Sequence, residues 1–152
     1  MPTHYKGNRQ DTAALNAYIN LVRASETVLG HAGEDLAAEG LTLAQFGALE
    51  ALFHLGPMCQ HQLSKKLLRT GGNVTYVVNK LERRGLVKRE RTKADRRQIA
   101  VRLTSSGQKL MERILPEHVR SITREFSPLS IDEQETLRRL CRKLGRGAGN
   151  PI

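Results

Sequence analysis

The sequence predicts a mainly α-helical chain that carries one small β-hairpin. Apolar residues recur every three or four positions over most of the 152 residues, which is typical of amphipathic helices. Over residues 86–103 the period changes to two around a polar centre, as in a hairpin of two short strands. Two short helical segments, separated by a turn with two glycines, come directly before this hairpin. Helix, turn, helix and hairpin in this order predict a winged helix-turn-helix, with further helices on both sides.

The chain before this motif is predicted as two helices. The first covers residues 11–30, and a break follows over residues 31–40. Thr42 begins the second, because Gln45 three residues later completes a capping box. The pair Gly56-Pro57 ends it. The residues expected to face the core are Leu15, Ile19 and Val22 in the first helix and Phe46, Leu49, Leu52 and Phe53 in the second.

The helix-turn-helix itself is predicted over residues 60–84. Its first helix covers residues 60–68, its turn residues 69–72 and its second helix residues 73–84. Gly85 then ends the second helix, as glycine commonly does after the last helical residue. The side chains expected inside are Leu63 and Leu67 from the first helix and Val74, Val77, Val78 and Leu81 from the second.

Two strands and two helices complete the chain. The strands are expected over residues 86–91 and 99–103. Thr104 begins a long helix that Pro116 should bend, because proline removes one backbone hydrogen bond. A second capping box over residues 130–133 begins the last helix, which runs to about residue 144. The apolar residues of these two helices are Leu110, Ile114, Ile122, Leu137, Leu140 and Leu144.

The positive charge is concentrated in the winged helix-turn-helix. Residues 60–103 hold 13 Lys and Arg against three acids, which gives +10, the net charge of the whole chain. The remaining residues hold 12 basic and 12 acidic side chains, so their net charge is zero. A solvated charged face would explain a basic surface, but charge confined to one structured block favours a surface that faces a polyanion.

The second helix of the motif begins with the residues that reading DNA requires. Reading base edges in the major groove needs short hydrogen-bond donors and acceptors in the first turns of the helix. Phosphate contacts need basic residues beside them. Asn73 can pair with an adenine edge. Simple helix capping by Thr70 and Asn73 is the alternative. The expected contacts of the turn and helix are Thr70, Gly72, Asn73, Thr75, Tyr76 and Lys80, with Lys65, Lys66 and Arg69 on phosphates.

The hairpin is expected to act as the wing, with its tip in the minor groove. A guanidinium there is favoured by the negative potential of a narrow groove. Asp95 is expected to orient Arg97, while a turn-initiating Asp beside solvated arginines is the alternative. The expected contacts of the wing are Arg91, Lys93, Asp95, Arg96 and Arg97.

A set of short motifs follows one order along the chain. It comprises Leu41-Thr42-x-x-Gln45-Phe46, Gly56-Pro57, Asn73-Val74-Thr75, Leu81-Glu82-Arg83-Arg84-Gly85-Leu86-Val87, Asp95-Arg96-Arg97 and Leu103-Thr104-x-x-Gly107. This set resembles the MarR family of bacterial and archaeal regulators. No single motif is decisive, but their order and spacing are specific, and the resemblance covers nearly the whole chain.

The resemblance implies an obligate homodimer that binds a near-palindromic double-stranded operator. Residues 1–40 and 105–152 would supply the dimerisation helices, and residues 41–104 would form the DNA-binding lobe. Such regulators usually repress, and they release DNA when a small phenolic or other aromatic ligand, or an oxidant, reaches the junction between dimer and lobe. By analogy with the family, Phe46 and His54 would line the ligand pocket.

The cysteines and histidines carry a weaker signal. Cys59 lies at a helix start, where a thiolate is favoured, so a redox role stands beside simple packing. Cys141 lies near the apolar stripe of the last helix and is expected to pack. No histidine pair has ligand spacing on one helix, so we expect neither a metal nor another cofactor.

Composition excludes several other classes of protein. No apolar run is long enough to span a membrane and no apolar signal core is present at the start, so a cytoplasmic location is expected. The motifs of thiol oxidoreductases, hydrolases and phosphate-binding enzymes are missing, which argues against an enzyme. RNA binding would require interleaved aromatics, which this chain lacks. The main alternative is a non-specific architectural DNA-binding protein without a ligand signal.

Overall fold

The computed structural model describes residues 3–67, 71–91 and 98–147. These residues form six helices and three strands. The helices are α1 (Arg9–Ala37), α2 (Leu43–Leu55), α3 (Gln60–Lys66), α4 (Gly71–Arg83), α5 (Ser105–Glu125) and α6 (Ile131–Gly147). The strands are β1 (Met58–Cys59), β2 (Val87–Arg91) and β3 (Ile99–Leu103). The predicted class, mainly helical with a small hairpin, is confirmed.

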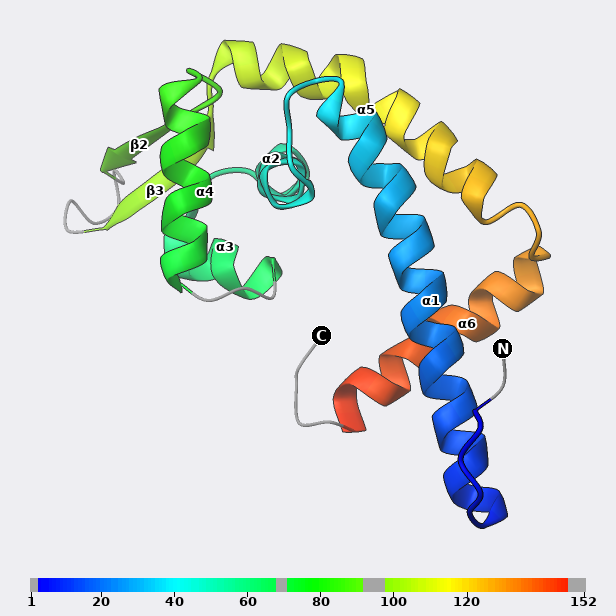
Figure 1. Ribbon diagram of the computed structural model, residues 1–152. Helices are drawn as coiled ribbons and strands as arrows, with labels where there is room; N and C mark the ends of the chain where they lie inside the picture. Colours follow the sequence, from blue (N-terminus) through cyan, green and yellow to red (C-terminus); the bar gives the residue numbers. More distant parts are fainter. Residues whose placement is uncertain (1–2, 68–70, 92–97, 148–152) are drawn as a thin grey trace.

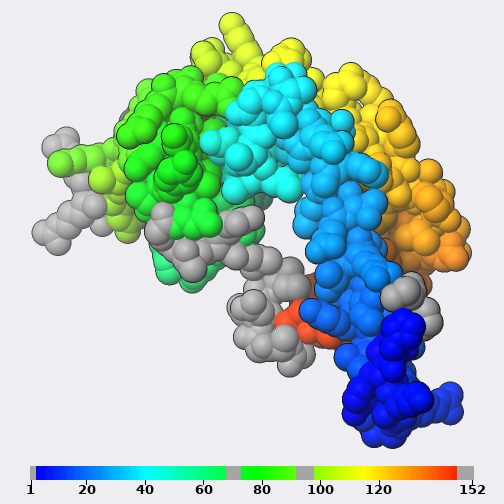
Figure 2. Space-filling view, viewed as in Figure 1, coloured from blue at the N-terminus to red at the C-terminus, as the bar shows by residue number. Residues whose placement is uncertain are grey.

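The elements form a compact lobe and a long helical arm (Figure 1). The lobe contains α2, α3, α4 and the sheet, while α5 leaves the sheet, curves over α2 and descends beside α1. Pro116 lies inside α5 without ending it. Figure 2 shows that the N-terminal half of α1 projects beyond the rest of the molecule. The arm therefore leaves long helical surfaces uncovered in the single chain.

One hydrophobic core joins the lobe to the C-terminal end of α1 and the first half of α5. The residues expected to fill it from α2 and α4 are buried except Phe53, which is half-buried, because apolar positions at helical spacing face inward on both helices. The capping box of α2 is present, with the Thr42 amide donating to Gln45 Oε1 at 2.9 Å. The buried side chains include Leu36, Leu41, Phe46, Leu49, Leu52, Leu63, Val74, Val77, Val78, Leu81, Val87, Val101, Met111 and Ile114.

The sheet contains one more strand than the sequence predicts. Its order is β1-β3-β2, and both pairings are antiparallel. The hairpin of β2 and β3 is as expected, with Val87 opposite Leu103 and Arg91 opposite Ile99. The third strand, β1, pairs Met58 with Val101 and has two residues. A strand this short cannot show an alternation of polarity, so it gives no period to detect.

The predicted end of the first helix is wrong. Helix α1 continues through Gly30 and the expected break to Ala37, because Ala32 and Leu36 extend its apolar face into the core. The true stop is Gly40, whose φ of +68° is a left-handed conformation that favours glycine. The Leu41 amide donates to Leu36 O there, which satisfies a terminal carbonyl of the helix.

The bounds of the helix-turn-helix also shift. Helix α3 ends at Lys66, two residues before its predicted end, and α4 begins at Gly71, two residues before its predicted start. Gly72 therefore lies inside α4, whereas the sequence predicts it in the turn. Leu67 is half-buried against the core.

Helices α1 and α6 expose apolar side chains along their length. On α6, Leu140 is 54% exposed and Leu144 61% exposed, and both belong to the apolar stripe that the sequence shows on this helix. Cys141, expected to pack, is exposed beside them. The other large apolar side chains exposed on these helices are Tyr18, Leu21, Leu29, Ile131 and Leu137.

A histidine–carboxylate pair joins α1 to the end of α5. His31 Nδ1 lies 3.0 Å from Glu125 Oε1. The hydrogen bond to Glu125, and next its negative charge, raise the pKa of His31 above its ordinary value of 6.5. A raised folded-state pKa stabilises the protein fully below the unfolded pKa, and this contribution is lost as the pH rises through the folded pKa.

We therefore expect wild type to exceed the variant His31→Gln in stability at mildly acidic pH, and the difference to vanish at higher pH. Urea unfolding at several values between about pH 5.5 and 8.5 measures this difference, since histidine titrates in that window. Glutamine keeps a polar side chain but cannot take up the proton. A difference that stays constant over the whole range would contradict the assignment.

Candidate nucleic-acid interface

Helices α3 and α4 form a two-helix unit with an apolar inside and a polar outside. Leu63 of α3 and Val74 and Val78 of α4 are fully buried between them and the core. The Cys59 amide donates to Gln62 Oε1 at 2.9 Å, which satisfies a backbone donor at the start of α3. The unit is therefore fixed from within, and its outer face remains available for binding.

Helix α4 turns a polar row of side chains away from the core. Asn73 and Tyr76 are exposed, and Tyr76 exposes 62% of its surface. Lys80 lies one turn further, with its Nζ atom 5.4 Å from the Tyr76 ring centroid. These residues are three and four positions apart, so they share one side of the helix. The structure brings together these three side chains, all predicted to contact DNA.

The other predicted contacts of the helix-turn-helix are placed less completely. Thr75 is exposed, but its hydroxyl accepts a hydrogen bond from Gln60 Nε2 at 2.6 Å. Lys65 and Lys66 are exposed at the end of α3. Arg69 and Thr70 lie outside the described residues.

The base of the wing is described and its tip is not. Arg91 is exposed at the end of β2, where the hairpin leaves the lobe. The predicted tip residues Lys93, Asp95, Arg96 and Arg97 lie outside the described residues, so the pairing of Asp95 with Arg97 stays a prediction.

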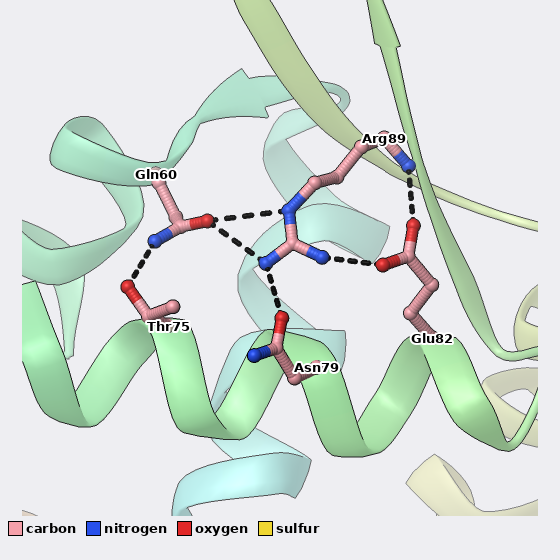
Figure 3. Close-up of polar contacts among 5 residues, drawn as sticks. All are labelled: Gln60, Thr75, Asn79, Glu82 and Arg89. Carbon is pink, nitrogen blue, oxygen red and sulfur yellow. Dashed lines mark hydrogen bonds and ion pairs between the residues drawn. The ribbon is translucent and has the colours of Figure 1, made fainter.

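Arg89 of β2 is bound inside the lobe, a role that our sequence analysis does not predict (Figure 3). Its guanidinium is ion-paired with Glu82 of α4 and also donates to Asn79 and Gln60. Its side chain is 23% exposed. One signal is present in the sequence, because Glu82 is the only acid among residues 60–89. A lone acid among basic residues is attracted to the nearest of them, which favours an ion pair.

Arg84, at the end of α4, joins the lobe to the arm. Its Nη1 donates to Gly40 O at 2.6 Å and its Nη2 donates to Glu39 O at 3.2 Å. The Glu39 carboxylate accepts two hydrogen bonds from Arg113 of α5, each of 2.7 Å. These bonds hold the pKa of Glu39 below its ordinary value. Two basic residues of the segment 60–103, Arg84 and Arg89, thus stabilise the fold.

A cavity of about 590 Å³ lies between the end of α1 and the middle of α5. His118, which lines it, stacks on the buried Phe46 at a ring distance of 4.3 Å. The His118 Nδ1 atom is buried and has no hydrogen-bond partner in the described chain. The predicted ligand residues Phe46, His54 and Cys59 do not line this cavity; His54 is exposed and Cys59 half-buried.

Within residues 3–67, 71–91 and 98–147, no group of three His, Cys, Asp or Glu side chains is placed to hold a metal ion. Over the same part of the chain, no helix has the length and apolar character needed to cross a membrane.

Comparisons with known proteins agree with this geometry. The sequence profile of the MarR family matches residues 41–99, which include the helix-turn-helix and most of the wing. The HTH-type transcriptional regulator YkoM of Bacillus subtilis is 39% identical over 132 residues, which cover 87% of this chain and 86% of the relative. The chain belongs to the MarR family. MhqR of Bacillus subtilis, an HTH-type transcriptional regulator, is 33% identical and covers 89% of this MarR-family chain, which covers 93% of MhqR.

Solved structures of other proteins match most of the chain, and one of them, AbsC, is described as a MarR family transcriptional regulator. AbsC of Streptomyces coelicolor has a TM-score of 0.85 and 20% identity, with 97% of this chain and 100% of AbsC covered, which supports the fold. MepR of S. aureus, solved with DNA, has a TM-score of 0.75 and 28% identity, with 86% and 97% covered. Bordetella bronchiseptica BpsR, whose DNA binding is regulated by 6-hydroxynicotinic acid, has a TM-score of 0.75 and 28% identity, with 85% and 98% covered.

These relatives give the MarR-family chain its general function. It is a DNA-binding transcriptional regulator with a winged helix-turn-helix, and its relatives are regulators and not enzymes.

Proposed function

We propose that the chain represses transcription as a homodimer bound to a near-palindromic operator. The polar row of α4 carries the proposal, because Asn73, Tyr76 and Lys80 share one side of a helix whose inner side is fully buried. A helix of this kind can enter the major groove and read base edges there. The remaining contacts of the turn and helix are proposed for Thr70, Gly72 and Thr75.

Phosphate contacts would hold the lobe on the duplex. Lys65 and Lys66 lie at the exposed end of α3, which precedes α4 in the chain. Contacts of this kind position a protein and carry no sequence information by themselves. Arg69 would add to this group, and the wing would reach the adjacent minor groove with Arg91, Lys93, Asp95, Arg96 and Arg97.

The exposed apolar faces of α1 and α6 support the homodimer. Apolar side chains gathered on one side of a helix and uncovered in the single chain indicate an association surface. A two-fold dimer would place two recognition helices about one turn of DNA apart, roughly 34 Å, which suits a near-palindromic site.

The test of this function is a selection of duplexes from a random-sequence pool by the purified protein. We expect the enriched duplex to contain inverted half-sites and to bind far more tightly than a random duplex of equal length. Its affinity should fall steeply with salt, because several phosphates are neutralised per subunit. Equal affinity for both duplexes would favour the architectural alternative.

Asn73→Ala tests base reading by α4. We expect a loss of about 1–3 kcal/mol that is confined to duplexes with the preferred base at one position of the half-site, because a base-edge contact discriminates by that amount. Binding to duplexes with each base at every position, measured by fluorescence anisotropy, gives the pattern. The same loss on every duplex would mean that Asn73 only caps or positions the helix.

Lys66→Gln is the matched comparison for that measurement. It removes one exposed charge beside the turn, so we expect weaker binding to all duplexes and a smaller salt slope, as for a lost phosphate contact. A base-specific effect of this variant would contradict its assignment to phosphate.

The signal is proposed to be a small aromatic or phenolic ligand, or an oxidant. The cavity between α1 and α5 supports a ligand, since its size suits a small molecule and His118 leaves a buried nitrogen without a partner in the described chain. Regulation of the related BpsR by 6-hydroxynicotinic acid points in the same direction. Phe46 would contribute through its contact with His118, and a role for His54 rests on the family analogy alone. Cys59 would be the thiol open to an oxidant.

A further inference from the structure

We propose that Arg89 is a positioning residue that fixes the rotation of the recognition helix α4 relative to α3 and the wing. The inference rests on the chain being a DNA-binding regulator, and it assigns to one arginine of the basic block a role other than binding phosphate. Arg89, Glu82, Asn79, Gln60 and Thr75 are called the clamp below (Figure 3).

The clamp joins three elements through one guanidinium. Arg89 Nη1 is ion-paired with Glu82 of α4, and the Arg89 amide donates to Glu82 Oε1 at 3.1 Å. Arg89 Nη2 donates to Asn79 Oδ1 at 2.7 Å and to Gln60 Oε1 at 3.1 Å. Gln60 begins α3, and its Nε2 donates to Thr75 Oγ1 at 2.6 Å. Strand β2 is thus bonded to α4 directly and to α3 through Gln60.

The contacts on α4 follow a line along the helix. Thr75, Asn79 and Glu82 are separated by four and three residues, so they lie on one side over about 10 Å of helix length. Asn73, Tyr76 and Lys80 form a second line on another side, and the buried valines form a third. A rotation of α4 about its axis would break several contacts of the clamp at once. The clamp therefore sets which side chains α4 presents to a bound duplex.

Its own bonds make Arg89 unsuitable as a phosphate ligand. Each nitrogen of its guanidinium donates to a partner in the lobe, and Glu82 balances its charge. Reaching a phosphate would require these bonds to break, and charge-assisted hydrogen bonds are the stronger class. Arg89 therefore contributes to the count of basic residues without facing the DNA.

Glu82→Gln distinguishes the two roles because they predict opposite results. The variant removes a negative charge from the lobe, so a purely electrostatic role predicts tighter DNA binding. The clamp predicts weaker binding, because the glutamine no longer carries the charge that holds Arg89. We expect an affinity about tenfold lower for the duplex selected by wild type, with little change for a random duplex and the same salt slope.

Glu90→Gln is the matched control. Glu90 lies on the neighbouring position of β2, pairs with Lys88 and Arg102, and is not part of the clamp. Glu90→Gln removes the same charge from the same lobe, so we expect affinity for the selected duplex that equals or exceeds that of wild type. If Glu82→Gln binds the selected duplex as tightly as Glu90→Gln, the positioning role is wrong.

Arg89→Lys provides a second, independent test that keeps the charge. A lysine can bind a phosphate, but its single ammonium cannot bridge Glu82, Asn79 and Gln60 as a planar guanidinium does. We expect a loss of selectivity like that of Glu82→Gln in a protein with unchanged oligomeric state. Wild-type selectivity in Arg89→Lys would overturn the proposal. Because wild-type selectivity is measured first, its absence would refute the proposed function and not the clamp.

Discussion

Leu140→Glu is expected to leave the chain folded and to abolish both dimerisation and operator binding. Leu140 lies between Leu137 and Leu144 on the exposed stripe of α6, at positions that share one side of the helix. In a dimer this stripe would be buried, and a buried carboxylate without a partner costs several kcal/mol per copy, so two copies would exceed the stability of an ordinary interface. Loss of the second half-site would lower the DNA affinity by about 10² or more.

Sedimentation equilibrium and anisotropy titration with the selected duplex measure the two effects. Arg142→Gln is the control, because it changes the net charge by the same amount on the opposite side of α6. We expect it to remain dimeric. A dimeric Leu140→Glu variant would show that α6 does not form the interface and would leave its exposed leucines without an explanation.

Gly107→Ala is expected to destabilise the protein by about 3 kcal/mol, as overpacking against a backbone atom does. A Cβ atom at this position would lie 2.1 Å from Leu86 O, the carbonyl that already accepts the Thr104 amide at 3.0 Å. That carbonyl belongs to the chain entering β2 and cannot move without disturbing the hairpin. The glycine of the Leu103-Thr104-x-x-Gly107 motif is therefore required by the close approach of α5 to β2.

Gly30→Ala is the matched control because its expected sign is opposite. Gly30 lies inside α1, and a Cβ atom there meets nothing within 4 Å. Alanine should stabilise that helix by about 0.5–1 kcal/mol, since glycine loses more backbone freedom on folding. Urea unfolding of both variants at one protein concentration gives the comparison, because dimer stability depends on concentration. Equal stability of Gly107→Ala and wild type would contradict the contact with Leu86.

The parts of the fold that the sequence predicts well are those with a strong local period. Val74, Val77, Val78 and Leu81 identify the inner side of α4, and the alternation after Gly85 identifies the hairpin. The end of α1 is misjudged because Gly30 resembles a stop, whereas burial of Ala32 and Leu36 outweighs its low helix propensity. Tertiary packing decides that boundary, and it is not visible in a local window of sequence.

The candidate site also has a part that the sequence predicts and a part that it does not. Exposure of Asn73 and Tyr76 follows from helical spacing, so it can be predicted from the sequence. The role of Arg89 cannot, because Gln60, Asn79 and Glu82 meet it only after α3, α4 and β2 pack together. A count of lysines and arginines therefore overstates the positive charge that faces DNA, because it cannot distinguish an arginine bound inside the lobe from one in solvent.

Helix α5 runs from the base of the wing to the C-terminal third of α1. At its start, the Thr104 hydroxyl donates to Gly85 O at 2.6 Å, and at its end Glu125 pairs with His31. Its 21 residues span about 31 Å, so a tilt of about 5° would move one end by about 3 Å relative to the other. That displacement is close to the rise of one base pair, about 3.4 Å. A small change in the angle between α5 and α1 would thus shift the lobe along the duplex by about the rise of one base pair.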